Sequence, residues 1–241
     1  MRTLAFAAAV CCFAAVPAAR AADMTDLLKA VPLPAVTGPA QDSATVASGL
    51  KEALAVGTKN AVGLLSKTDG YFGNEAVKIL LPENVRRVGD ALRMAGYQKE
   101  VDAFVLSMNR AAEKAAPKAA DIFAGAIRDM SIADAQKILN GGNTAATEYF
   151  KSKTSARLFE AFKPDISQSM NEVGVTKAYK AMTDRYTSMM PFAKLDALDL
   201  DKYVTDKSLD GLFYMVGQEE TKIRTNPAAR TTELLRKVFA K

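Results

Sequence analysis

Residues 101–115, VDAFVLSMNRAAEKA, decide the fold class of this 241-residue chain. The apolar residues of the stretch follow one another at the spacing of one face of an α-helix; they are Val101, Phe104, Val105, Met108, Ala111, Ala112 and Ala115. An apolar stripe of this kind has to be covered by other elements. We therefore predict a helix whose apolar face lies in a core made with neighbouring helices.

Three polar residues, Asn109, Arg110 and Glu113, interrupt this helix. With about 100° of rotation per residue, Asn109 and Glu113 fall at the flank of the apolar stripe, whereas Arg110 is expected to face away from it. Flank residues are normally structural, so a hydrogen bond to a neighbouring segment is the preferred interpretation, with Arg230 as the candidate partner of Glu113. The functional alternative is a polar cleft in which Glu113 acts as an acid or base.

Helical spacing continues along most of the chain, and capping residues mark several helix boundaries. Ser131 and Asp134 form a capping box, and Thr205 is expected to cap a later helix. Apolar faces lead into Pro164 and continue beyond it, and Pro227 stands at the first position of a last helix. The pattern predicts an all-α, single-domain bundle of about ten helices.

The least helical part of the body is SKTDGYFGNEAVKILLP, residues 66–82. It contains turn-forming Asp-Gly and Gly-Asn pairs, and residues 76–81 allow one short extended segment. Tyr71 and Phe72 stand between the two turns. Aromatic residues on such a loop contact a ligand or partner, or fold back as a lid on the core; the lid is the favoured interpretation.

The N-terminus, MRTLAFAAAVCCFAAVPAARA, has the layout of a secretory signal peptide, so residues 1–21 are expected to be cleaved. Its apolar run is too short to span a bilayer, and no membrane span is expected after cleavage. Residues 22–42 are interpreted as a flexible linker or tail, and 43–241 as the domain. The expected location is periplasmic or secreted. Lipoprotein anchoring through Cys11 or Cys12 is disfavoured, because Val10 and Cys11 stand where a small residue is expected.

Composition excludes several chemistries. The chain has no histidine, and both of its cysteines lie in the signal region. A Ser-His-Asp or Cys-His nucleophile, an ordinary zinc or copper site, and a Cys- or His-ligated haem or iron–sulfur cluster are therefore excluded from the mature chain. We expect no metal and no cofactor. The net charge of +5 falls to +3 once Arg2 and Arg20 leave with the signal, which gives no reason to expect a nucleic-acid partner.

Three further clusters were considered as sites. The aspartates of LDALDLDKYVTDKSLD (195–210) match a calcium loop poorly, because Val204 replaces the glycine of the sharp turn. NGGNTAATEYF (140–150) could present helix N-terminal N–H groups to an anion, but two successive helix caps explain it without a ligand. Glu220 and Arg224 have the spacing of an ion pair on one helix.

Several stretches match a known family in order; they are EALAVGTKNAVGLLSKTDGYFGNEAVKILLPENV, SMNRAAEKAAPKAADIF, DAQKILNGGNTAATEYF, DKSLDGLFYMVGQEETKIR and NPAARTTELLRKVF. Through them the chain resembles the bacterial exported domain-of-unknown-function family 4197 over about residues 43–239. The resemblance implies an exported or envelope location and a single helical domain. It implies no activity and no site residue.

The sequence therefore favours a non-enzymatic binding or structural module of the bacterial envelope, whose partner is an unknown envelope protein or an apolar ligand. One alternative is a carrier that holds an apolar small molecule or lipid within the bundle. A second is an enzyme that uses carboxylate and arginine side chains. No catalytic residue is assigned, and the candidate binding residues are Asn109, Glu113, Arg230, Tyr71 and Phe72.

Overall fold

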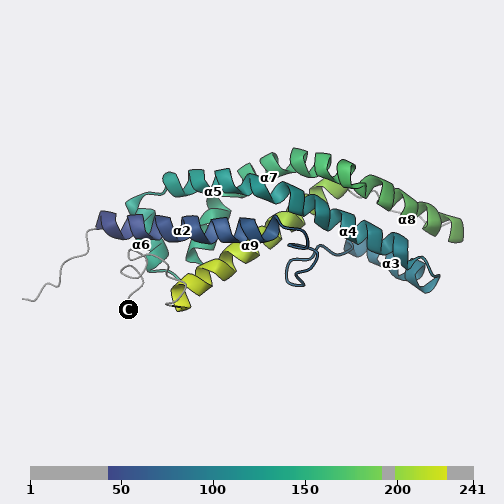
Figure 1. Ribbon diagram of the computed structural model, residues 1–241, viewed down its shortest axis with the longest axis horizontal. Helices are drawn as coiled ribbons and strands as arrows, with labels where there is room; N and C mark the ends of the chain where they lie inside the picture. Colours follow the sequence, from purple (N-terminus) through teal and green to yellow (C-terminus); the bar gives the residue numbers. More distant parts are fainter. Residues whose placement is uncertain (1–42, 192–198, 227–241) are drawn as a thin grey trace, which may run out of the picture. The chain divides into compact units, whose positions relative to one another are not determined.

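The central helix is α4 (Gln98–Ala115), in a computed structural model that describes residues 43–191 and 199–226. All seven positions of its predicted apolar stripe are buried, which confirms the helix and its inward face. Figure 1 shows α4 alongside α7 (Ala145–Val173) and α8 (Val175–Met189), with α3 (Glu83–Met94) packed at its N-terminal end. Alanines on the α4 stripe leave room for these close helix contacts.

The other helices build the remainder of the core around α9 (Leu200–Thr225). Helix α2 (Ser43–Leu65) lies beside α9, and α5 (Ala119–Arg128) and α6 (Ile132–Leu139) pack against α2. A 3₁₀ turn, η1 (Ala116–Lys118), joins α4 to α5. The all-α class is confirmed for the described ranges, which contain no strand; they hold eight α-helices and η1, fewer than the ten or so predicted for the chain.

Two predicted helix boundaries differ in the structure. Helix α7 runs through Pro164, because the side chains on either side of it, Phe162 and Ile166, are both fully buried and hold the helix in the core. Thr205 is not a cap. The cap of α9 is Asp199, six residues earlier, which accepts a hydrogen bond from the Lys202 N–H at 2.9 Å.

Other boundaries follow the prediction. The Ser131–Asp134 capping box opens α6, with both of its reciprocal hydrogen bonds present.

Residues 76–81 form no strand: residues 75–77 are a turn, and residues 78–82 run on to α3 without regular structure.

The described residues belong to one compact unit. The predicted signal peptide (1–21), the linker (22–42) and the last helix with Arg230 lie outside the described residues, so they stay predictions.

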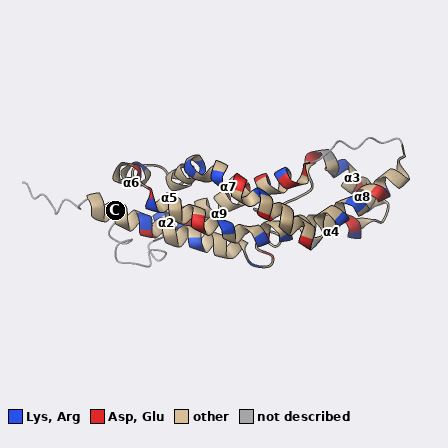
Figure 2. Ribbon diagram, turned by 90° about the horizontal axis from the view of Figure 1, so that it is seen from above, with Lys and Arg blue, Asp and Glu red and all other residues tan. Residues whose placement is uncertain are grey.

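Lys and Arg are interspersed with Asp and Glu along the helices, as Figure 2 shows. Charge of one sign therefore does not dominate any described helix face in this view.

Candidate functional site

The segment 66–82, here called the loop, leaves α2 through a turn that only glycine can complete. Asp69 has a φ of +66°, and a Cβ on Gly70 would lie 2.7 Å from the Leu65 carbonyl oxygen. The Gly73 N–H then donates to the Asp69 carbonyl at 2.9 Å. These turns direct the loop across the flank of α4 that carries Asn109 and Glu113.

Asn109 holds the second half of the loop. Its Oδ1 accepts the Ile79 N–H at 2.8 Å, and its Nδ2 donates to the Ile79 carbonyl at 2.8 Å. Nδ2 also donates to the Val105 carbonyl of α4 at 2.8 Å. Because Asn109 and Ile79 are almost completely buried, these bonds replace water for both polar backbone groups of Ile79.

Glu113 holds the first half of the loop. Its Oε1 accepts the N–H groups of Tyr71 and Phe72 at 3.1 and 3.2 Å. Its Oε2 accepts Arg110 Nη1 at 2.6 Å. The carboxylate is buried, with both oxygens engaged, so it acts as an anchor for backbone amides.

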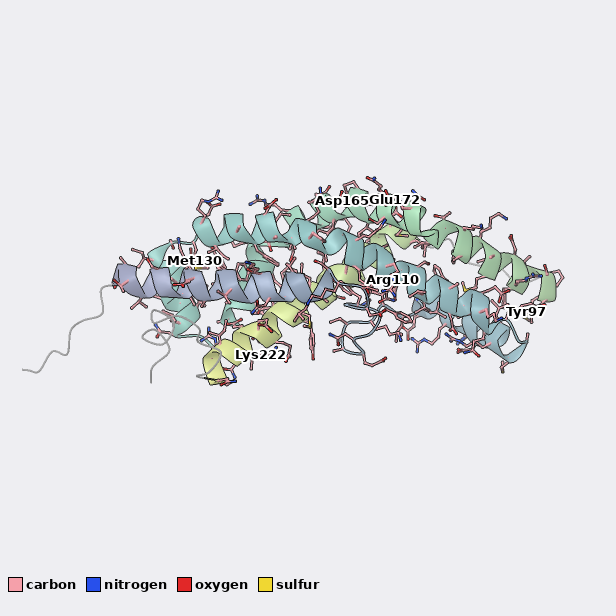
Figure 3. The ribbon with its side chains drawn as sticks, in the orientation of Figure 1. Tyr97, Arg110, Met130, Asp165, Glu172 and Lys222 are labelled. Carbon is pink, nitrogen blue, oxygen red and sulfur yellow. The ribbon has the colours of Figure 1, made fainter. Side chains whose placement is uncertain are left out.

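The position of Arg110 differs from the prediction. It does not face away from the core but bends along α4 to Glu113, and its Nη2 donates to Asp69 Oδ1 at 2.8 Å. The hydrogen bond with Glu113 raises the pKa of the Arg110 guanidinium above its ordinary value. Figure 3 shows Arg110 where α4 meets the loop. The arginine that pairs with Glu113 thus comes from the same helix, and Arg230 lies outside the described residues.

Tyr71 and Phe72 have different surroundings. Tyr71 is fully buried, and its hydroxyl donates to the Ser208 carbonyl of α9 at 2.7 Å. Burial is the main reason why the pKa of this phenol is raised, and Glu113 adds to it. Phe72 is only partly buried, with Lys78 Nζ 4.3 Å from its ring centroid. Tyr71 therefore folds into the core as a lid would, whereas Phe72 remains at the surface.

Beside Phe72 lies a hollow of about 580 Å³ between the loop, α3 and α4, here called the loop groove. It is lined by Phe72, Lys78, Leu80, Leu81, Arg86, Asp90, Arg93, Asp102 and Val105. Leu80 is 60% exposed, although the backbone directly before it is held at Ile79 by Asn109. Its own carbonyl accepts the Tyr203 hydroxyl at 2.9 Å.

The basic side chains on the wall of the loop groove are paired with carboxylates, some of which lie outside the lining. Arg93 lies 3.6 Å from Asp90 and 3.4 Å from Asp102, and Arg86 lies 2.7 Å from Glu83. The groove therefore combines apolar side chains with a charged wall, in which three basic residues stand beside two acidic ones. Sequence reasoning did not assign these residues; the Arg and Asp spacing on α3 marks an exposed helix face but gives no sign of what lies opposite it.

A second buried glutamate repeats the arrangement around Glu113. Glu220 accepts the N–H groups of Ala146 and Thr147, each at 2.9 Å, and pairs with Arg224 at 3.0 Å. Arg224 Nη2 also donates to the Ile138 carbonyl at 2.8 Å. The N-terminus of α7, which the sequence favours as a helix cap without a ligand, is thus occupied by the chain's own carboxylate.

Of the aspartates considered as a calcium loop, Asp196 lies outside the described residues, and the others lie on α9 or cap it. Asp199 caps the helix, and Asp210 pairs with Lys207 at 3.1 Å. Their helical arrangement excludes the sharp turn that a calcium loop requires. Within residues 43–191 and 199–226 no group of three or more acidic side chains has the geometry to hold a metal ion.

A family model described as "Protein of unknown function (DUF4197)" matches residues 40–240. The chain belongs to the DUF4197 family. A search of curated proteins and a search of solved structures found no match for this DUF4197 protein. Among its described helices, none is long and apolar enough to cross a membrane.

Proposed function

We propose that this DUF4197 protein is a non-enzymatic binding module of the bacterial envelope, and that its loop groove docks a segment of a partner protein. The observation that carries the proposal is the exposure of Leu80 within a loop whose backbone is fixed by Asn109, Glu113 and Tyr203. A binding surface held in place before its partner arrives loses less conformational entropy on binding.

The composition of the loop groove supports a protein partner. Protein interfaces have an apolar centre and a polar rim, and here Phe72, Leu80 and Leu81 line a hollow whose other walls carry charged residues. The rim pairs are exposed, so they can exchange partners at little cost. We expect the partner to insert an apolar side chain beside Leu80 and to meet the rim with polar groups.

The two other functions considered have less support. An acid or base role requires Glu113 to reach an open cleft, whereas both of its oxygens are engaged in a buried site. For a carrier, a pocket between α2, α7 and α9, which the buried Glu220 and Arg224 also line, measures only about 10 Å³, far below the size of an apolar ligand. Native mass spectrometry of protein purified from its own host tests the carrier function directly.

The docking proposal is tested by photo-crosslinking in cells. A benzophenone amino acid replaces Leu80 in one strain and Ile132 of α6, which is 48% exposed, in the control strain. We expect Leu80 to give a discrete adduct that Ile132 does not. The same adduct should weaken in an Arg86→Glu background and persist in Arg157→Glu, an exposed change on α7. Absence of an adduct at Leu80, or the same adducts from both positions, would overturn the proposal.

A further inference from the structure

A second hollow, of about 570 Å³, lies between α6 and the first turns of α7, here called the α6–α7 hollow. It is lined by Asp134, Lys137, Ile138, Gly141, Ala145, Glu148, Tyr149, Ser152 and Lys153. Four of these side chains are charged at neutral pH, two of each sign. No residue that lines the α6–α7 hollow also lines the loop groove, so the two hollows are separate.

The charged groups of the α6–α7 hollow differ from those of the loop groove because most of them are unpaired. Among the described residues, Lys137, Glu148 and Lys153 make no ion pair, and the Tyr149 hydroxyl has no hydrogen-bond partner. Asp134 is the exception, since it is held by Ser131 in the capping box. The hydrogen bonds with Ser131 lower the pKa of Asp134, and the charges of Lys153 and Lys137 add to this effect. Because neither lysine is held in an ion pair with a described residue, side chains of both signs can contact a ligand.

Side chains of α9 hold the backbone of both walls of the α6–α7 hollow in place. Arg224 holds the Ile138 carbonyl at the end of α6, and Glu220 holds the N–H groups of Ala146 and Thr147 at the start of α7. Because Glu220 and Arg224 also pair with each other, the two walls are joined through one buried ion pair. Such support preorganises the lining side chains.

We infer that the α6–α7 hollow binds a short zwitterionic peptide with an apolar side chain. The lysines Lys137 and Lys153 offer contacts to a terminal carboxylate, and Glu148 offers one to a terminal ammonium. The four ionisable side chains sum to zero charge, so a neutral zwitterion fits them better than a simple anion or cation. Ile138, Ala145 and the Tyr149 ring provide apolar surface for the side chain.

The size of the α6–α7 hollow favours a peptide over a single amino acid. Ligand sites commonly measure about 300–1,000 Å³, and an extended tripeptide spans roughly 10 Å. The probe is therefore the tripeptide Ala-Leu-Ala with free termini, titrated into the isotopically labelled protein and followed by backbone amide chemical shifts. Because the hollow is open, we expect a dissociation constant on the order of 0.1–1 mM.

The expected shifts are confined to α6 and the start of α7. Lys153→Gln and Glu148→Gln should each weaken binding about fivefold, as expected for one exposed charge contact. Lys151→Gln is the matched control, because Lys151 is an exposed lysine two residues away that lines a different hollow and should leave binding unchanged.

Blocked forms of the tripeptide test the charge requirement. N-acetylation should remove the contact with Glu148, and C-amidation should remove the contact with the lysines, so each should bind more weakly than the free peptide. Equal binding of the blocked and free forms, binding that persists in both Lys153→Gln and Glu148→Gln, or no shifts at about 10 mM peptide would each overturn the inference.

Discussion

Replacement of Asn109 by alanine should destabilise the protein through the loop. The change leaves the Ile79 N–H and carbonyl without partners at a position that is 1% exposed. Each buried polar group that loses its partner costs about 1–3 kcal/mol, so we expect a loss of about 3 kcal/mol after some access of water. Asn109→Asp keeps the shape but turns Nδ2 into an oxygen that faces two carbonyls, and it should cost about 4 kcal/mol.

The assay is urea unfolding followed by circular dichroism, with hydrogen exchange at the Ile79 amide as the local measurement. Asn74→Ala is the matched control: Asn74 is a loop asparagine whose Oδ1 accepts the Ala76 N–H at 3.1 Å in an exposed turn, and its Nδ2 makes only a long contact of 3.6 Å with Met215 Sδ. It should cost less than about 1 kcal/mol. If Asn109→Ala unfolds like wild type and its Ile79 amide stays protected, Asn109 does not hold the loop.

Three other predictions concern the contacts of α9. Glu220→Gln should cost about 3 kcal/mol in urea unfolding, because it removes the charge that Arg224 and two N–H groups of α7 share; an unchanged midpoint would contradict this. The raised pKa of the Tyr71 phenol means that the unfolded chain releases this proton first, so the free energy of unfolding should fall as pH rises above about 10. Tyr71→Phe should lose less stability than wild type between about pH 8 and about pH 10.5, and equal losses would refute the assignment. Gly211→Ala should cost about 1–3 kcal/mol, because its Cβ would lie 2.8 Å from Tyr71 Cε1. Gly63→Ala, on the open face of α2, should stabilise the protein by about 0.5–1 kcal/mol. A lower thermal midpoint for Gly63→Ala than for Gly211→Ala would contradict both expectations.

The helices were largely predictable because their signals are local. The apolar stripe of α4 and the Ser131–Asp134 box depend only on residues within a few turns, and both are present in the structure. Thr205 was wrongly assigned as a cap because Asp199, a stronger capping residue, lies only six positions earlier and opens the helix first.

The candidate site was predictable only in part because its contacts join distant segments. Helical geometry placed Asn109 and Glu113 correctly at the edge of the core, but their partners, Ile79 and the amides of Tyr71 and Phe72, lie 30 to 42 residues away. Arg110 was misplaced because a long side chain can bend toward a buried carboxylate although its Cα faces outward. Glu220 and Arg224 pair as their spacing indicates, but the contacts of Glu220 with α7 span 73 and 74 residues.

The dependence of both glutamate sites on distant segments also bears on when the chain can fold. Glu220 caps α7, Ser208 receives the Tyr71 hydroxyl, and α9 covers α2, so segments made early in synthesis are completed by one of the last helices. A nascent chain that lacks α9 would leave the N-terminus of α7 and the core face of α2 uncovered. Folding should therefore wait until synthesis is nearly finished. If the N-terminus does direct export, this delay would keep the chain unfolded for passage through a narrow translocation channel.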